Sequence, residues 1–237
     1  MENEKSGRFG YACAILLAMS YVIVGLTYLF LPADQKGGTM LHDPEKFLAS
    51  MNQAPALITI HHLAFGLGAL VGLAVVLAVF DLARDYHKAA VRWASGLGLL
   101  GFAVTAIDNF KIVANEPVRA ARYISGDPVM KSIMKATDYL VSVDPQMWLG
   151  YGLVGFWALA GSWILWRNKA VPRVFGILGI AVGLSYFFVE IGTVIRSEIW
   201  LTVAAAAGAV IVGPVWYVWL AMILRKWGRA RCRPGAE

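Results

Sequence analysis

The stretch that decides the fold is Pro55–Ala83, PALITIHHLAFGLGALVGLAVVLAVFDLA. It exceeds the roughly 20 apolar residues that a helix needs to cross a bilayer, and its ionisable side chains, His61, His62 and Asp81, lie towards its ends. The whole chain has the same character, because 59% of its 237 residues are hydrophobic and only 15% are charged. Soluble domains carry about 25% charged residues, so the composition indicates a membrane protein.

Five further apolar segments flank this one and give six expected spanning helices. No β pattern is visible, which agrees with the need of lipid-exposed segments to satisfy their backbone internally. Pro214 lies inside the last segment and predicts a kink. We expect an all-α, polytopic six-helix bundle that forms a single membrane domain over residues 1–237. Its helices are expected at about residues 10–31, 55–83, 89–114, 145–166, 173–195 and 199–224.

Two polar connections carry signals for short extra helices. Asp43-Pro44 and Asp127-Pro128 each combine a good N-cap residue with a proline at the first helical position. The first signal predicts a helix over Pro44–Met51. The second opens an amphipathic segment between spanning helices 3 and 4, which we expect to lie on the membrane surface or to cap the bundle. Its apolar face comprises Met130, Ile133, Met134, Thr137 and Val141.

The distribution of lysine and arginine predicts the orientation. With six helices both termini lie on one side, and that side carries thirteen bases and five acids, against eight bases and ten acids on the other. Cytoplasmic loops are enriched in lysine and arginine, so we expect cytoplasmic termini, a basic cytoplasmic tail at 225–237 and a periplasmic amphipathic helix. The net charge of +6 is thereby explained by topology, and we expect no nucleic-acid partner.

The ionisable residues inside the apolar segments are expected at one depth. Asp108 and Glu190 each lie 17 residues beyond the inner ends of their helices, at Val91 and Arg173. At about 1.5 Å per residue, both are roughly 25 Å from the cytoplasmic boundary. The two histidines lie about one turn inside the outer end of their helix. Because such groups usually face a bundle interior and find partners there, we expect a polar pocket that opens outward.

This pocket supplies the candidate functional residues. The candidate catalytic residues are Glu190, Asp108, His61 and His62, and the residues expected to contact a substrate are Tyr186, Tyr151, Thr105, Asn109 and Trp148. Structural roles remain open for some of them. Asp108 can pair with Lys111 within one helix, and the histidines can serve only to hydrogen-bond neighbouring helices. Glu190 has no cation within four residues along its own helix.

A histidine and two carboxylates in an apolar pocket suit acid–base chemistry. The expected ligand is a small apolar or amphiphilic molecule that enters from lipid, such as an isoprenoid, sterol or quinone. Isomerase, hydratase or cyclase chemistry fits better than redox chemistry, because no redox-cofactor motif is visible. One alternative is a non-catalytic accessory or assembly subunit, bound to other membrane subunits or to itself. Another is an ion or proton transporter, although the apolar inner halves offer no polar path.

No cofactor is expected from the histidine pattern. A bis-histidine haem needs ligands on facing helices, and only one expected helix carries intramembrane histidines. A metal held by His61 or His62 together with Asp108 and Glu190 is the remaining option, as in carboxylate-rich iron, manganese or zinc sites.

The segment Leu165–Leu184, LWRNKAVPRVFGILGIAVGL, joins the fourth and fifth expected helices through a basic turn. It resembles a segment of an uncharacterised family of small bacterial membrane proteins with six or seven helices. The resemblance implies a multi-pass protein of the bacterial inner membrane. It implies no activity.

Overall fold

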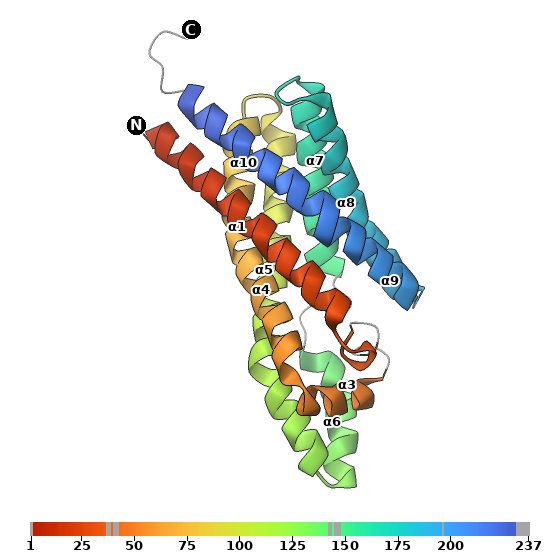
Figure 1. Ribbon diagram of the computed structural model, residues 1–237. Coiled ribbons are helices and arrows are strands. Elements are labelled where there is room, and N and C mark those ends of the chain that lie inside the picture. Colours follow the sequence, from red (N-terminus) through yellow and green to blue (C-terminus); the bar gives the residue numbers. More distant parts are fainter. Residues whose placement is uncertain are drawn as a thin grey trace.

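The structure is a computed structural model, shown in Figure 1, and it describes residues 2–36, 39, 43–141, 144, 148–195 and 197–230. Its regular elements are helices, and six of the helices are long and apolar enough to cross a membrane. The expected all-α fold with six spanning helices is therefore confirmed. Large apolar side chains such as Leu67, Ile107 and Phe188 point outward, where lipid covers them. The protein is a multi-pass membrane protein in contact with the bilayer.

The spanning helices are α1 with α4, α5, α7 and α8, and a last one built from three consecutive pieces. Two short helices, α3 and α6, and a 3₁₀ turn lie in the connections. In chain order the elements are α1 (Glu2–Phe30), η1 (Ala33–Gln35), α3 (Pro44–Gln53), α4 (Pro55–Ala83), α5 (Lys88–Ser125), α6 (Pro128–Val141), the π-helical turn η2 (Trp148–Gly152), α7 (Leu153–Arg167), α8 (Arg173–Val194), α9 (Glu198–Ala205), the π-helical η3 (Ala206–Val212) and α10 (Gly213–Ala230).

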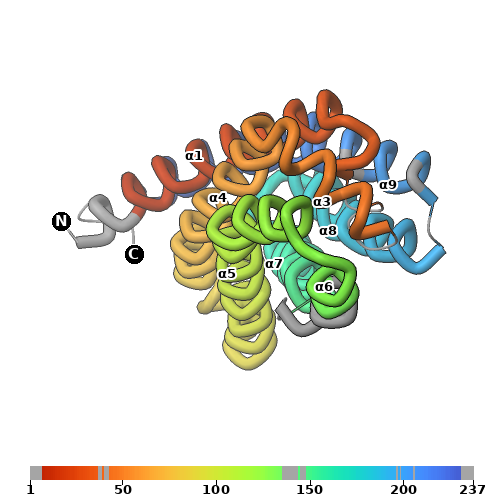
Figure 2. Tube along the Cα trace, turned by 90° about the horizontal axis from the view of Figure 1, so that it is seen from below, coloured from red at the N-terminus to blue at the C-terminus, as the bar shows by residue number. Residues whose placement is uncertain are grey.

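Both ends of the chain lie at one end of the bundle, and α3 and α6 lie at the opposite end (Figure 1). The first and last helices pack side by side, α4 packs between α1 and α5, and α7 packs on α5 and α8. Figure 2 views the bundle from the α3–α6 end and shows α1 along one side, with α5 and α7 towards the other. This common end for the termini agrees with the expected even number of crossings.

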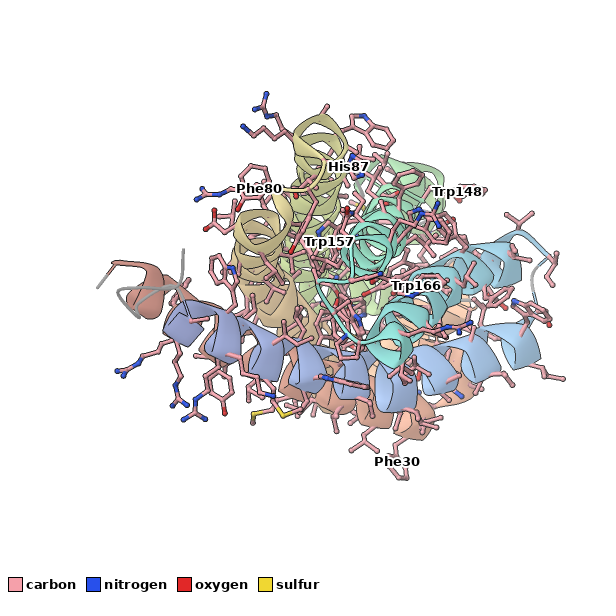
Figure 3. All side chains as sticks on the ribbon, turned by 90° about the horizontal axis from the view of Figure 1, so that it is seen from above. Phe30, Phe80, His87, Trp148, Trp157 and Trp166 are labelled. Carbon is pink, nitrogen blue, oxygen red and sulfur yellow. The ribbon has the colours of Figure 1, made fainter. Side chains whose placement is uncertain are left out.

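The half of the bundle nearer the chain ends has a dense apolar and aromatic core. Trp157 of α7 is 1% exposed and points into the centre of the bundle (Figure 3). It packs edge-to-face against Phe102 of α5 and Trp216 of α10, and Trp216 in turn stacks on Phe175 of α8. Helices can approach this closely because glycines such as Gly98 leave room for an indole ring.

The outer bounds of the first and last helices differ from the expectation. The first was expected from residue 10 and begins at Glu2, and the last was expected to end at 224 and continues to Ala230. The physical reason is that these ends pack on each other. Gly7 lies against Gly228, where any added Cβ would be 2.7 Å from the Gly228 Cα, and Arg225 lies over the Tyr11 ring at 5.4 Å. The first six residues of the expected tail 225–237 are therefore helical.

The third spanning helix also differs, because it was expected to end at 114 before Pro117. α5 instead includes Pro117 and continues to Ser125. A proline inside a helix removes one hydrogen bond and usually breaks or kinks it. Here tertiary packing outweighs that loss, since Glu116, Ala120 and Tyr123 are buried on one face, where α5 packs on α3.

The predicted irregularity near Pro214 takes the form of a π-helical stretch. Residues 206–212 are π-helical and lie directly before Gly213 and Pro214. The ring of a proline collides with the carbonyl four residues earlier in a regular α-helix. The wider π-helical turn removes this collision, so the apolar segment continues across the membrane without a loop.

The short helices form a second, smaller core at the end of the bundle away from the termini. The Asp43 side chain accepts a hydrogen bond from Lys46 N at 3.3 Å, as expected for the N-cap of α3. α3 buries Phe47, Leu48 and Met51, and Met134 of α6 joins them. Of the face predicted for α6, Met130 and Ile133 are exposed, whereas the side chains of Thr137 and Val141 are outside the described residues.

Gln35 fixes the corner between α3 and α4, a role that its isolated position did not suggest. It is buried, and its Nε2 donates to the carbonyl oxygens of Ser50 at 3.0 Å and Ala54 at 2.9 Å. These carbonyls belong to the end of α3, where intrahelical donors run out.

Residues 145–147, the expected start of the fourth spanning helix, and residues 231–237 of the tail are not among the described residues.

The expected orientation is tested by reporter fusions. Because the termini carry the excess of bases, green fluorescent protein after Glu237 should fluoresce in the cytoplasm. Alkaline phosphatase after Gly126, at the other end of the bundle, should be active because it is exported. Activity of a phosphatase fused after Glu237, with a dark fluorescent protein there, would contradict this orientation.

Candidate functional site

The site begins with a buried hydrogen bond between α4 and α5. His62 Nδ1 lies 2.8 Å from Asn109 Oδ1, and Asn109 Nδ2 donates to Thr105 O at 2.8 Å. The second bond fixes the amide, since a carbonyl oxygen can only accept, and so turns Oδ1 towards the imidazole. His62 Nδ1 therefore donates, and a neutral His62 ring keeps an acceptor at Nε2.

His61 faces α1 instead. Its Nδ1 lies 3.1 Å from the Val24 carbonyl oxygen and 2.9 Å from Thr27 Oγ1. Because the carbonyl only accepts, Nδ1 of His61 carries the hydrogen, and Thr27 donates its own hydroxyl to the Ile23 carbonyl at 2.7 Å. Both histidines thus tie neighbouring helices together, and the neutral rings present Nε2 as an acceptor.

A second polar group lies on the far side of α5. The backbone N–H of Asp144 donates to Asp108 Oδ2 at 3.1 Å, and the Asp144 carboxylate accepts from Gly150 N at 2.7 Å. Asp144 thereby caps the π-helical turn η2 while bringing its acid next to Asp108. Thr105 donates to Gly101 O, and its hydroxyl lies against Gly150, where an added Cβ would be 2.8 Å from Oγ1.

The surroundings of Asp144 shift its ionisation. Burial raises the pKa of this carboxyl, the backbone N–H groups of Gly150, Leu149 and Trp148 lower it, and the Asp108 carboxyl raises it, with a net rise. A carboxyl whose folded pKa is raised contributes to stability below its unfolded pKa, and this contribution is lost as the pH rises through the folded pKa. The same shift lets Asp144 keep its proton to a higher pH than an ordinary aspartate.

Glu190 of α8 approaches the same turn from the other side. Its side chain is 5% exposed, and its Oε1 lies where a Cβ on Gly152 would be 2.6 Å away. Its carboxyl also interacts electrostatically with Asp144. The backbone N–H of Gly152 also interacts with this carboxyl. Among the described residues, Oε1 itself has no hydrogen-bond partner, and no cationic side chain pairs with Glu190. Glu190 thus presents an open acceptor position in the bundle interior.

Aromatic rings connect the two polar groups. The Tyr151 ring stacks on Phe65 at 5.9 Å and contacts Tyr186 at 5.8 Å, and Phe65 also contacts His61 at 6.3 Å. Tyr151 interacts electrostatically with Asp144, which places its hydroxyl near the acids. We call Tyr21, Phe65, Tyr151, Tyr186 and Tyr217 the aromatic group; it joins α1, α4, η2, α8 and α10.

The structure therefore brings most of the sequence-derived candidates into two neighbouring groups. His62, Asn109 and Thr105 lie in one connected set, and Tyr151 and Tyr186 lie beside Glu190. Trp148 does not join them, because it is 47% exposed and lies at the periphery in Figure 3. Within the described part of the chain, neither histidine is hydrogen-bonded to an acid. Pairing of Asp108 with Lys111 stays a prediction.

Asp144 is the residue that sequence reasoning missed. Asp144-Pro145 has the N-cap and proline pattern of a helix that starts at 145. That pattern accounts neither for the bond to Gly150 N, six residues on, nor for the contact with Asp108. No sequence pattern predicts that Asp144 is buried, because the residue lies in a long polar connection. The available hint was the glycine-rich run Trp148–Gly152, since small residues let a backbone approach neighbouring side chains closely.

No three His, Cys, Asp or Glu side chains among the described residues come together as metal ligands would. The set proposed from sequence, a histidine with Asp108 and Glu190, is not gathered around one point. The two histidine Nδ1 atoms are instead occupied by Asn109 and by Val24 with Thr27.

Comparison with known protein families gives one match. The family model described as Domain of unknown function (DUF4386) matches residues 11–223, which is most of the chain and includes every residue of the two polar groups. The chain belongs to the DUF4386 family. This agrees with the resemblance of Leu165–Leu184 to an uncharacterised membrane family. No curated protein and no solved structure matches the chain.

The close fit between Gly152 and Glu190 predicts the effect of a single methyl group. In Gly152→Ala the new Cβ would be 2.6 Å from Glu190 Oε1, so the buried carboxyl must move away from the position it has in the wild-type protein. We expect a destabilisation of about 1–3 kcal/mol, measured as a lower unfolding temperature in mild detergent.

Gly96→Ala is the matched control. A Cβ at Gly96 meets nothing within 4 Å, so this change should leave stability equal or raise it by about 0.5–1 kcal/mol through helix propensity. Equal unfolding temperatures for the two variants would contradict the tight packing at Gly152.

Proposed function

We propose that this protein binds a small amphiphilic molecule in the polar site around η2 and acts on it by acid–base chemistry. The observation that carries the proposal is that Asp108 and Glu190, from separate helices, each come within electrostatic reach of Asp144 at one glycine-rich turn. One of them, Glu190, keeps an open acceptor position although it is buried. Buried polar groups without partners are rare, and a ligand is one way to satisfy them.

The chemistry follows from the unlike surroundings of the acids. Asp144, with its raised pKa, suits a general acid that protonates a substrate. Asp108 accepts the Asp144 N–H at Oδ2, which holds its carboxyl beside Asp144, so we assign it the role of the base. Proton addition and removal at neighbouring positions are the steps of isomerisation, hydration and cyclisation of an apolar substrate. The substrate classes we favour are isoprenoid-, sterol- and quinone-like molecules.

The apolar core argues against an ion or proton pathway across the bundle. Between the polar site and the chain ends, Trp157, Phe175, Trp216 and Leu220 are packed with almost no exposure. A relay would need ionisable side chains or water along this half. The site therefore fits access from the outer leaflet alone, in a bacterial cytoplasmic membrane whose inner face lies at the chain ends.

Ligand retention tests the binding step. Protein purified in mild detergent should carry a co-purifying amphiphile, identified by mass spectrometry of an extract. Glu190→Gln should lower its amount about tenfold or more, because a hydrogen bond to a charged group contributes roughly 1.5–3 kcal/mol. Asp81→Asn is the control, since Asp81 forms only an exposed pair with Arg84 at 3.4 Å. The same small-molecule content in all three proteins would count against a ligand site and favour an accessory subunit.

Access from outside is tested separately by cysteine labelling. Thr193 lies one turn beyond Glu190 on α8 and is half-buried, with its hydroxyl donating to Val189 O at 3.1 Å. With Cys13 and Cys232 replaced by alanine, Thr193→Cys should react in intact cells with a membrane-impermeant maleimide. Val174→Cys, at the other end of α8, should react only after permeabilisation. If the Thr193→Cys protein is expressed normally and does not react with the maleimide in intact cells, access to the site from outside is contradicted.

A further inference from the structure

The polar site offers hydrogen-bond acceptors and few donors. The carboxyls of Asp108 and Glu190 each lie near that of Asp144. His61 and His62 bond through Nδ1, which leaves Nε2 of a neutral ring as an acceptor. In the part of the chain that the structure describes, Glu190 Oε1 receives no hydrogen bond. A ligand that satisfies Glu190 must therefore bring a donor, and a positively charged donor is favoured because Asp108 and Asp144 add further acidic groups nearby.

The aromatic group adds a second attraction for positive charge. Tyr151 lies between Phe65 and Tyr186, and Tyr21 contacts Tyr186 and stacks on Tyr217 at 5.3 Å. The faces of such rings are electron-rich and attract cations, most strongly where water is excluded. The hydroxyls of Tyr186 and Tyr217 lie near each other, and at the distance between them neither is hydrogen-bonded to a described residue, so each can accept or donate a hydrogen bond.

An apolar cleft begins at two of these rings. It lies between α1 and α4 and is lined by Leu17, Val24 and Gly68 together with Tyr21 and Phe65. Its volume is about 10 Å³, so it holds at most one water-sized sphere in this conformation. A hydrocarbon chain that enters here must part α1 from α4, and its leading end would then reach the aromatic group.

We infer that the ligand of this site is a lipophilic ammonium ion, with its nitrogen beside Glu190 and its hydrocarbon body in the α1–α4 cleft. This inference rests on the proposed function and narrows its ligand class. An ammonium group supplies N–H donors and the counter-charge that Glu190 lacks among the described residues. The inference therefore replaces the quinone-like class proposed above, because a ketone or quinone carries only acceptors and would place its oxygen against the Glu190 carboxyl.

A bare metal ion fits less well than an ammonium ion. Divalent cations need several oxygens converging at about 2.0–2.6 Å. The described acids do not converge in this way. An ammonium ion on a carbon chain can instead bind one carboxylate directly while its methylene groups lie against the ring faces, which is the arrangement available here.

The inference is tested by three matched probes on the full chain in nanodiscs of zwitterionic lipid. The probes are hexylammonium, hexanol and hexanoate at equal concentrations, and the readout is the unfolding temperature followed by tryptophan fluorescence. A ligand that binds only the folded state raises this temperature. Hexylammonium should raise it by several degrees, hexanol by much less, and hexanoate not at all.

Variants locate the effect at Glu190. In Glu190→Gln the rise in unfolding temperature with hexylammonium should be at least threefold smaller. Asp81→Asn removes an exposed acid from a different helix, α4, and should leave this rise unchanged. If Glu190→Gln fails to fold, the ammonium assignment is still tested by comparing how much each of the three probes raises the unfolding temperature of the unaltered protein. Protection by hexanol equal to or above that by hexylammonium would overturn the ammonium assignment.

The failure of this inference is distinguishable from failure of the proposed function. If no probe protects but the purified protein carries a Glu190-dependent neutral amphiphile, the ammonium assignment is wrong and the ligand site stands. If no probe protects and nothing co-purifies in a Glu190-dependent manner, both are wrong.

Discussion

The backbone of the π-helical turn Trp148–Gly152 lies directly against polar side chains of α5 and α8, and the site depends on this contact. Gly150 faces Thr105 and donates its N–H to the carboxylate of Asp144, while Gly152 faces Glu190. Side chains at these two positions would separate the helices. Because the glycines bring three helical segments together, acids that are far apart in sequence come within electrostatic reach of one another, in a bundle otherwise held by apolar contacts.

The spanning helices could be predicted because their signal is local. A run such as Pro55–Ala83 contains its own evidence, and α4 has the predicted bounds. The helix ends were harder, because tertiary packing sets them. α5 passes Pro117 since its next turns are buried where they meet α3, and α10 passes residue 224 since it pairs with the start of α1. Neither contact is visible from the composition of the segment itself.

Residue counting addresses the depth of the candidate site and not its pairing. It predicts Asp108, Glu190 and the histidines at one level, in the outer half, but it cannot tell which neighbours they meet. His61 and His62 are adjacent in sequence and point to different helices, one to Thr27 of α1 and the other to Asn109 of α5. Asp144 escaped prediction because a connection has no periodicity from which a direction can be derived.

The pairing of α1 with α10 has a consequence for how the protein is made. A chain enters the membrane from its N-terminus, so α1 is inserted first, while its most extensive neighbour is synthesised last. Until then the glycine-lined face of α1 that Gly228 and the η3 segment will cover, including Gly7 and Gly25, is open to lipid or to other helices. Contacts between distant parts of a chain form late. The ring of helices is therefore completed only when α10 packs on α1. If synthesis stops before α10, the face of α1 that α10 would cover stays exposed in the membrane.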